Sequence, residues 1–236
     1  TAACNGQLTA AWRDKQVLGA DGNGEAMVSE VPVGWESSRV DDVCTNVVDC
    51  PHSTPKWTDQ GEVCLRTTNF RVGQLDLDAV RYVSRETFDK RVKRLVPQGG
   101  DVIYSREGGI RGIACLMPNG LRACLGQRMM LMRAESDRCH PAYLMHVLNS
   151  PLTTSVVREM TGGTASPHLN VGDIKAFAVP LPPLAEQHEI VRRVDALFKL
   201  AEAIERRVAA ATAKADKLTQ AILAKAFRGE LVPTEA

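Results

Sequence analysis

Residues 184–229 read LAEQHEIVRRVDALFKLAEAIERRVAAATAKADKLTQAILAKAFRG, and this stretch decides how the chain is organised. Apolar and small residues recur in it at alternating spacings of four and three, the heptad pattern of a helix that packs lengthwise against another helix. No Gly or Pro interrupts residues 184–228, and most other positions are Ala, Glu, Lys or Arg, which favour helix. We call the repeating positions the heptad seam; they are Ile190, Val194, Leu197, Ala201, Ile204, Val208, Ala211, Ala215, Leu218 and Ile222.

The predicted helix is long for a chain of this size. A helix over residues 190–228 would extend ~58 Å at a rise of 1.5 Å per residue, more than one modest domain could cover. We therefore expect residues 184–236 to form a long helix that pairs with a partner helix. The alternative is a helix that lies on its own domain. The residues expected to make the helix pairing are Ile190, Val194, Leu197, Ile204, Val208, Leu218 and Ile222.

Composition predicts a folded, cytoplasmic protein. The 236 residues are 44% hydrophobic, enough for a core, and contain neither a run of 18 apolar residues nor a visible secretory signal. The seven cysteines are odd in number, so free thiols are favoured over disulfides. Cys44, Cys50, His52 and Cys64 lie close in sequence but lack the paired spacing of zinc ligands, so no metal site is predicted.

The net charge of +1 conceals a strong segregation. Residues 66–133 carry 13 Lys and Arg against 6 Asp and Glu, a net +7, whereas residues 1–65 carry 4 against 10. Eleven of the 13 cations in the basic stretch are Arg, whose planar fork suits phosphates and guanine edges. A solvated surface is the alternative reading of the charge alone. The basic stretch is nevertheless the place to look for a nucleic-acid contact.

The region before the long helix reads as a mixed α/β domain. Short apolar runs broken by turn residues predict strands, and helical spacing predicts two helices, the second interrupted near Pro151. Residues 13–31 have little apolar periodicity and read as a flexible linker. The expected strands are 63–68, 101–105, 110–117, 128–133 and 174–179, and the expected helices are 85–95 and 141–160.

DNA recognition requires phosphate contacts for affinity and base-edge contacts for specificity, and three segments of the basic stretch carry suitable side chains. One leaves a predicted strand, one is a cluster of cations, and one is a glycine-containing loop between two predicted strands. For any single residue a salt-bridged or solvated role is an equal alternative. The DNA-binding candidates are Arg66, Thr67, Asn69, Arg71, Lys90, Arg91, Lys93, Arg94, Ser105, Arg106 and Arg111.

No catalytic motif is visible. The chain has no phosphate-cradling G-x-x-x-x-G-K-[ST], no G-x-G-x-x-G and no H-E-x-x-H. It also lacks the Glu-x-Lys pair of many nucleases and the Asn/Asp-Pro-Pro-aromatic run typical of amino-methyltransferases. The five histidines are scattered, which favours structural or surface roles. We therefore expect no catalytic residue.

An internal echo stands beside the motifs that carry a family resemblance. Ala3–Leu8 echoes Ala226–Leu231, in which Gly229 is placed to cap the long helix, so residues 1–8 read as the tail of a second, similar helix. The string PLPPLAEQ at 180–187, which runs into the heptad helix, resembles the specificity subunit of type I restriction-modification systems. The same family is indicated by VPVGW at 31–35, by GGT at 162–164 with HLN at 168–170, and by AKAFRGEL at 224–231.

The resemblance implies a non-catalytic DNA-recognition role. Such subunits carry two target recognition domains, each of which reads half of a split DNA site, and two long spacer helices that pair antiparallel. The helices dock methyltransferase subunits, which hold S-adenosylmethionine and methylate adenine N6. A restriction subunit adds ATP- and Mg-dependent translocation and cleavage. No cofactor is expected on this chain itself, and no membrane partner.

The chain departs from the family plan because it contains one recognition domain and one complete helix. The resemblance therefore divides it into a helix tail with linker at 1–31, a recognition domain at 32–183 and a spacer helix at 184–236. It resembles the C-terminal half of a full subunit, or a half-subunit that dimerises. Two alternatives stay open: the recognition module of a single-chain restriction–methylation enzyme, and a coiled-coil interaction protein without a nucleic-acid role.

Overall fold

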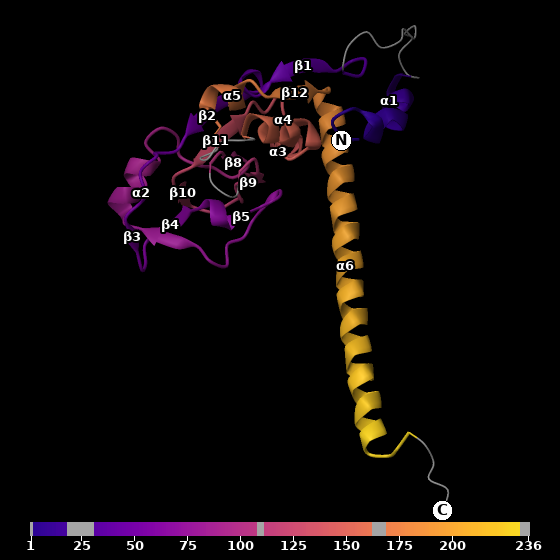
Figure 1. The fold of residues 1–236 in the computed structure, drawn as a ribbon. Coiled ribbons are helices and arrows are strands. Elements are labelled where there is room, and N and C mark those ends of the chain that lie inside the picture. Colours follow the sequence, from indigo (N-terminus) through magenta and orange to yellow (C-terminus); the bar gives the residue numbers. More distant parts are fainter. Residues whose placement is uncertain (1, 18–30, 108–110, 162–168, 232–236) are drawn as a thin grey trace, which may run out of the picture. The chain divides into compact units, whose positions relative to one another are not determined.

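The computed structural model describes residues 2–17, 31–107, 111–161 and 169–231. The chain divides into two compact units, Thr1–Val191 and Arg192–Ala236. Among these residues, the first unit contains all the strands and the shorter helices, and the second contains most of the long helix (Figure 1). Within the described residues no helix is long and apolar enough to cross a membrane. The fold is mixed α/β followed by a long helix, as expected.

Two four-stranded sheets form the centre of the first unit. The order of the first is β10-β4-β7-β3, in which β10 and β4 run parallel and the other pairs antiparallel. The order of the second is β2-β11-β8-β9, antiparallel throughout. These strands are β2 (Cys44–Asp49), β3 (Trp57–Thr58), β4 (Glu62–Leu65), β7 (Arg81–Val83), β8 (Val102–Ser105), β9 (Ala114–Leu116), β10 (Ala123–Leu125) and β11 (Met129–Ala134).

Two further strand pairs complete the unit. Strand β1 (Glu36–Arg39) pairs antiparallel with β12 (Ala178–Leu181), so that the chain enters and leaves the sheet region side by side. Strands β5 (Phe70–Arg71) and β6 (Gln74–Leu75) form a short hairpin. The predicted strands at 63–68, 101–105 and 128–133 are confirmed within a few residues, and the one at 110–117 is shorter in the structure.

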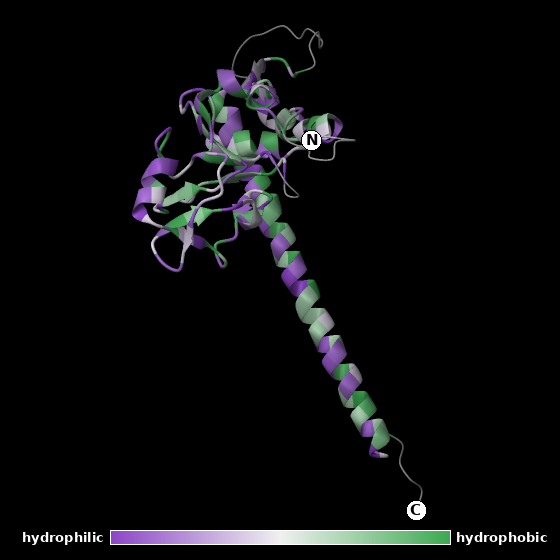
Figure 2. Cartoon of the chain, turned by 60° about the vertical axis from the view of Figure 1, so that its left-hand side comes forward, coloured by the Kyte–Doolittle hydropathy of each residue, from purple (hydrophilic) through white to green (hydrophobic). Residues whose placement is uncertain are grey.

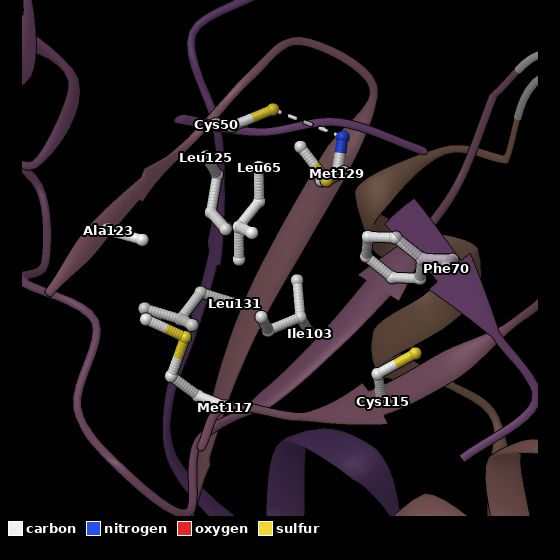
Figure 3. Close-up of a cluster of buried hydrophobic side chains, with 10 residues drawn as sticks. All are labelled: Cys50, Leu65, Phe70, Ile103, Cys115, Met117, Ala123, Leu125, Met129 and Leu131. Carbon is white, nitrogen blue, oxygen red and sulfur yellow. Dashed lines mark hydrogen bonds between the residues drawn. The ribbon is translucent and has the colours of Figure 1, made fainter. Parts of the chain in front are cut away.

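The main core lies between the two sheets (Figure 3). Successive strand residues face opposite sides, so Ile103 and its register partner Leu131 point into the same cluster as Leu65 and Phe70. A smaller cluster on the first sheet includes Phe88 of α2 (Arg85–Arg91). Burying such side chains contributes roughly 1.5–3 kcal/mol each, which makes the stacked sheets a rigid support for the surface loops.

The second predicted helix is two helices in the structure, separated where Pro151 indicated. They are α3 (Pro141–Leu148) and α4 (Pro151–Thr161). His140 caps α3 by accepting the Ala142 backbone N–H at Nδ1 (3.2 Å). Helix α3 packs on β8, β9 and β11, the face of the second sheet opposite the core.

Two predictions from the sequence are wrong. Residues 13–17 are not linker, because the N-terminal segment forms η1 (Gln7–Thr9) and α1 (Ala10–Val17); residues 18–30 lie outside the described residues. Residues 174–175 are not strand but end helix α5 (Val171–Lys175), whose N-terminus is capped by Asn170 and Asp173. Here local capping prevails over the strand preference of Ile174, which is buried in the helical turn. Two short 3-10 turns, η2 (Val40–Asp42) and η3 (Thr67–Asn69), complete the elements.

Helix α6 (Leu184–Phe227) confirms the long helix, with apolar and polar residues along its whole length (Figure 2). Its end is a Schellman motif: Gly229 has φ 72°, its N–H donates to Ala226 O (3.0 Å), and Glu230 N–H donates to Lys225 O (2.9 Å). Ile190 is fully buried within the first unit, so the expectation that it pairs helices is wrong.

The remaining seam positions of α6 are accessible. Val194 is half-buried, and the five large apolar side chains beyond it are between 46% and 60% exposed. A stripe of this kind is unusual in a solvated helix. The stripe consists of Leu197, Ile204, Val208, Leu218 and Ile222.

Candidate nucleic-acid interface

Four of the predicted DNA-binding residues are buried and belong to the fold. Arg91 is the clearest case, because its guanidinium donates to three backbone carbonyls: Nε to Leu125 O (2.6 Å), Nη1 to Ser53 O (3.1 Å) and Nη2 to Pro51 O (3.0 Å). These bonds fasten the loop after β2 to the end of β10. The four buried residues are Asn69, Arg91, Ser105 and Arg106.

Asn69 and Ser105 are likewise committed to local structure. Asn69 accepts the Arg66 backbone N–H at Oδ1 (2.9 Å) and donates through Nδ2 to Asp76 O (2.9 Å), which closes the β5–β6 region. Ser105 Oγ accepts the Ile113 backbone N–H (3.1 Å). A buried polar group that makes such bonds would lose them on turning outward, so neither side chain is available to DNA.

Arg106 joins three chain segments at one end of the sheets. Its Nη1 donates to Leu169 O (2.9 Å), and its Nη2 lies 3.2 Å from the ring nitrogens of His52 and 2.8 Å from Glu107 Oε1. Asp49 also contacts His52, at 3.2 Å. Arg106 is therefore a support for the surrounding surface rather than a contact residue.

The other predicted residues remain exposed or half-buried. Arg71 pairs with Asp76 (2.9 Å), Lys90 with Glu86 (2.6 Å), and Arg94 with Asp49. Exposed ion pairs of this kind contribute only about 0.2–1 kcal/mol, so these cations can exchange their partners for phosphate oxygens. The predicted residues that the structure leaves accessible are Arg66, Thr67, Arg71, Lys90, Lys93, Arg94 and Arg111.

Three arginines around the first sheet, Arg81, Arg85 and Arg122, were not among the residues predicted from the sequence. Arg81 and Arg66 lie over the Trp57 ring, at 5.3 and 6.0 Å from its centroid. Arg122 and Arg85 lie over the Phe88 ring at 4.4 and 5.9 Å. Both members of the second pair also contact Glu62. The aromatic rings hold the guanidinium planes in place, an arrangement that only the strand pairing of the fold brings about.

Arg128 is a second residue that sequence reasoning missed. Among the described residues it is the one non-glycine residue with positive φ, 74°, a left-handed conformation that costs roughly 1–2 kcal/mol for an L-residue. Its carbonyl accepts the Arg106 backbone N–H (3.0 Å), while its side chain is exposed. No sequence signal could have found it, because Gly or Asn usually occupies such positions.

The two polar residues of the PLPPLAEQ string, Glu186 and Gln187, lie in the first turn of α6 and anchor it to other segments. Glu186, 1% exposed, accepts Thr9 Oγ1–H (2.5 Å) and Arg13 Nη1–H (2.6 Å) at Oε1, and Trp35 Nε1–H (3.1 Å) at Oε2. Its neighbour Gln187 is fully buried. Glu186 therefore ties the N-terminal segment and the loop before β1 to the first turn of α6.

Gln187 ties the same turn to the loop before α3. Its Oε1 accepts the His140 backbone N–H (2.7 Å), and its Nε2 donates to Arg138 O (2.8 Å) and Pro182 O (2.9 Å). Both N–H donors of the buried amide and one lone pair of its oxygen are thus matched by backbone groups. Together, Glu186 and Gln187 fix the direction in which α6 begins within the first unit.

All seven cysteines are free thiols, and six of them are buried. Burial raises the pKa of Cys44, Cys115 and Cys139 each to about 12. Cys64 and Cys124 are register partners on β4 and β10, and the hydrogen bond between their thiols raises the pKa of Cys64 and lowers that of Cys124. In the described residues no group of three or more His, Cys, Asp or Glu could hold a metal ion.

Comparison with known proteins gives a consistent result. Residues 32–211 match the family described as type I restriction modification DNA specificity domain. The chain is 32% identical over 234 residues to the EcoKI specificity subunit of Escherichia coli (strain K12), covering 97% of this chain and 47% of that protein. It is 35% identical over 167 residues to the Escherichia coli EcoBI specificity subunit, covering 71% and 35%.

The fold agrees with the sequence match. The crystal structure of the HsdS subunit from Thermoanaerobacter tengcongensis superposes with a TM-score of 0.58 at 22% identity, over 84% of this chain and 50% of that one. The chain thus spans half or less of the length of each of these proteins.

Proposed function

Because this chain belongs to the type I restriction modification DNA specificity family, we propose that it reads one half of a split DNA site for an adenine-N6 methyltransferase complex. The observation that carries the proposal is the net +7 of residues 66–133, a region that folds into two four-stranded sheets and leaves several of its arginines exposed. Cations supply sequence-independent affinity for phosphates, and forked donors supply base discrimination. The chain itself would perform no chemistry.

The second part of the proposal concerns α6. Its exposed seam would pack antiparallel against the corresponding helix of another half, either in the same polypeptide or in a second copy of this chain. Support comes from the exposure of Leu197, Ile204 and Leu218, all above 50%. The seam alanines Ala201, Ala211 and Ala215 would let the two backbones approach closely. The length of the paired helices would then set the gap between the half-sites.

The third part concerns partners and cofactors. The paired helices would dock methyltransferase subunits, and a restriction subunit where the system has one. S-adenosylmethionine, ATP and Mg would bind to those partners rather than to this chain. The complex would act on cellular DNA in the cytoplasm.

The test is a map of methylated adenines. The chain is expressed with its methyltransferase subunit in a host that lacks N6-methyladenine, and the genome is sequenced for this base. We expect one split motif, which disappears when the chain is omitted while the methyltransferase is retained. Methylation without a defined motif, or a motif that does not depend on this chain, would contradict the proposal.

A binding measurement tests the role of the cations. Lys93 is exposed and makes no ion pair or hydrogen bond in the described part of the chain, so Lys93→Ala removes charge without disturbing a contact. The salt dependence of duplex DNA affinity should fall by about one unit of log–log slope if Lys93 meets a phosphate. Lys175→Ala, which removes a lysine paired with Asp41 at 2.9 Å, is the matched control.

A further inference from the structure

Arg128 has a strained backbone conformation, and no hydrogen bond or ion pair of its side chain with the described residues offsets the cost. The residue holds φ at 74°, and the other residues with positive φ in the described chain are glycines. A glycine or asparagine would adopt this conformation more readily. The Arg128 side chain is exposed and makes no hydrogen bond or ion pair with the described residues. The side chain therefore contributes nothing to the fold that would offset the backbone conformation.

The conformation is imposed from both sides. Before it, Gly126 N–H donates to Leu65 O (2.8 Å), and a Cβ on Gly126 would lie 2.9 Å from that same oxygen. After it, Met129 N–H donates to Cys50 Sγ (3.1 Å), and Met129 O accepts Cys50 N–H (3.0 Å) (Figure 3). The loop between β10 and β11 is thus held at both ends, and it leaves the side chain of Arg128 exposed.

The surroundings of this loop are polar and built from several segments. The Arg128 carbonyl is held by the backbone N–H of Arg106, whose guanidinium contacts His52. Gln127 Nε2 donates to Thr54 Oγ1 (3.2 Å), and Thr54 is exposed. The two Nη atoms of Arg106 have partners within the chain and its Nε is buried, whereas all five N–H donors of Arg128 are unpaired among the described residues. Arg128 is therefore an exposed guanidinium at this end of the sheets that can bind a ligand without first giving up an ion pair.

We infer that Arg128 contacts DNA, donating two parallel hydrogen bonds to a pair of acceptor oxygens or nitrogens in the bound half-site. The inference rests on the proposed function and names a residue for it. Two acceptor pairs in DNA fit the guanidinium fork: O6 and N7 of guanine, or two oxygens of a phosphate. The strained loop would then position the guanidinium of Arg128 for this contact.

Two variants separate this role from a structural one. Arg128→Asn keeps a residue that accepts left-handed backbone but removes the charge, and Arg128→Lys keeps the charge but removes the fork. Thermal unfolding of Arg128→Asn should occur at the same temperature as wild type or higher, because strain is relieved. Arg39→Asn, which removes another exposed cation, from β1, is the matched control.

DNA readouts are taken on the full chain with its methyltransferase subunit. The probe is a duplex that carries the motif mapped for the wild-type complex. We expect Arg128→Asn to bind about ten-fold more weakly and Arg39→Asn to bind within two-fold of wild type. Loss of discrimination at one motif position in both Arg128 variants assigns the contact to guanine. If the motif is unchanged, and the salt dependence of DNA affinity falls for Arg128→Asn but not for Arg128→Lys, the contact is to a phosphate.

The inference can fail independently of the proposed function. If wild type yields no motif, the proposed function is wrong. If wild type yields a motif, and Arg128→Asn binds and methylates it as wild type does, Arg128 makes no DNA contact. A marked drop in the unfolding temperature of Arg128→Asn would show that the side chain serves the fold, which would also overturn the inference.

Discussion

Replacing Glu186 by glutamine tests whether one carboxylate holds the N-terminal segment to the start of α6. The side chain is 1% exposed and accepts hydrogen bonds from Thr9, Arg13 and Trp35. Glutamine keeps the shape but turns an amide N–H₂ toward at least one of these donors. Breaking a fully buried ion pair costs about 3–5 kcal/mol. Because the Arg13 side chain is 23% exposed and can regain water, we expect about 2–3 kcal/mol for Glu186→Gln.

The measurement is urea unfolding combined with limited proteolysis. With a slope of about 2–3 kcal/mol per M for a unit of this size, the midpoint should fall by about 1 M. Proteolysis near Arg13 should accelerate before the sheets unfold, since the segment loses its anchor. Glu202→Gln, an exposed carboxylate on α6, should leave both unchanged. An unaltered midpoint together with an intact N-terminal segment in Glu186→Gln would refute this account.

Three further outcomes follow from the same contacts. Ile204→Asp places a charge on the exposed seam and should abolish helix pairing, seen as a smaller mass in sedimentation, while the unfolding of the first unit is unchanged. Arg91→Met leaves three backbone carbonyls without their hydrogen-bond donor and should destabilise the first unit by about 2–4 kcal/mol in urea unfolding. A loss below about 0.5 kcal/mol would instead show that Arg91 behaves as a surface residue. Because the pKa values of Cys44, Cys115 and Cys139 are about 12, these thiols should resist alkylation at pH 8.5 in the folded protein, followed by mass spectrometry. Their pKa values are raised on folding, so the stability they confer is complete below about pH 9 and declines as the pH rises toward 12. Rapid labelling at pH 8.5 would contradict the raised pKa values.

The elements that were predictable are those encoded by local sequence. A heptad pattern without Gly or Pro specifies α6, and Gly229 marks its end because a left-handed C-terminal cap favours glycine. Pro151 separates α3 from α4 because it cannot continue a helix that requires its N–H. In each case a few neighbouring residues carry the whole signal.

The elements that escaped prediction depend on contacts distant in sequence. Strand β3 has two residues and exists only because β7 pairs with it. The roles of the arginines were equally hidden: Arg91 and Arg128 look alike in a basic stretch, yet one is sequestered by carbonyls of loops far away and the other faces solvent. The charge pattern of the sequence therefore pointed to the candidate interface, but it did not distinguish arginines that stabilise the fold from arginines that are accessible to a ligand.

The pairing of β1 with β12 has a consequence for how such chains can be recombined. Glu36 lies opposite Leu181, so the two points at which the polypeptide enters and leaves the sheet region are one strand spacing apart, about 4.8 Å. A segment with adjoining ends can be exchanged for another of different size without displacing what precedes or follows it. Residues 36–181 are in this sense a cassette: a foreign cassette with the same pair of terminal strands would inherit both the anchoring at Glu186 and the register of the helix beyond it.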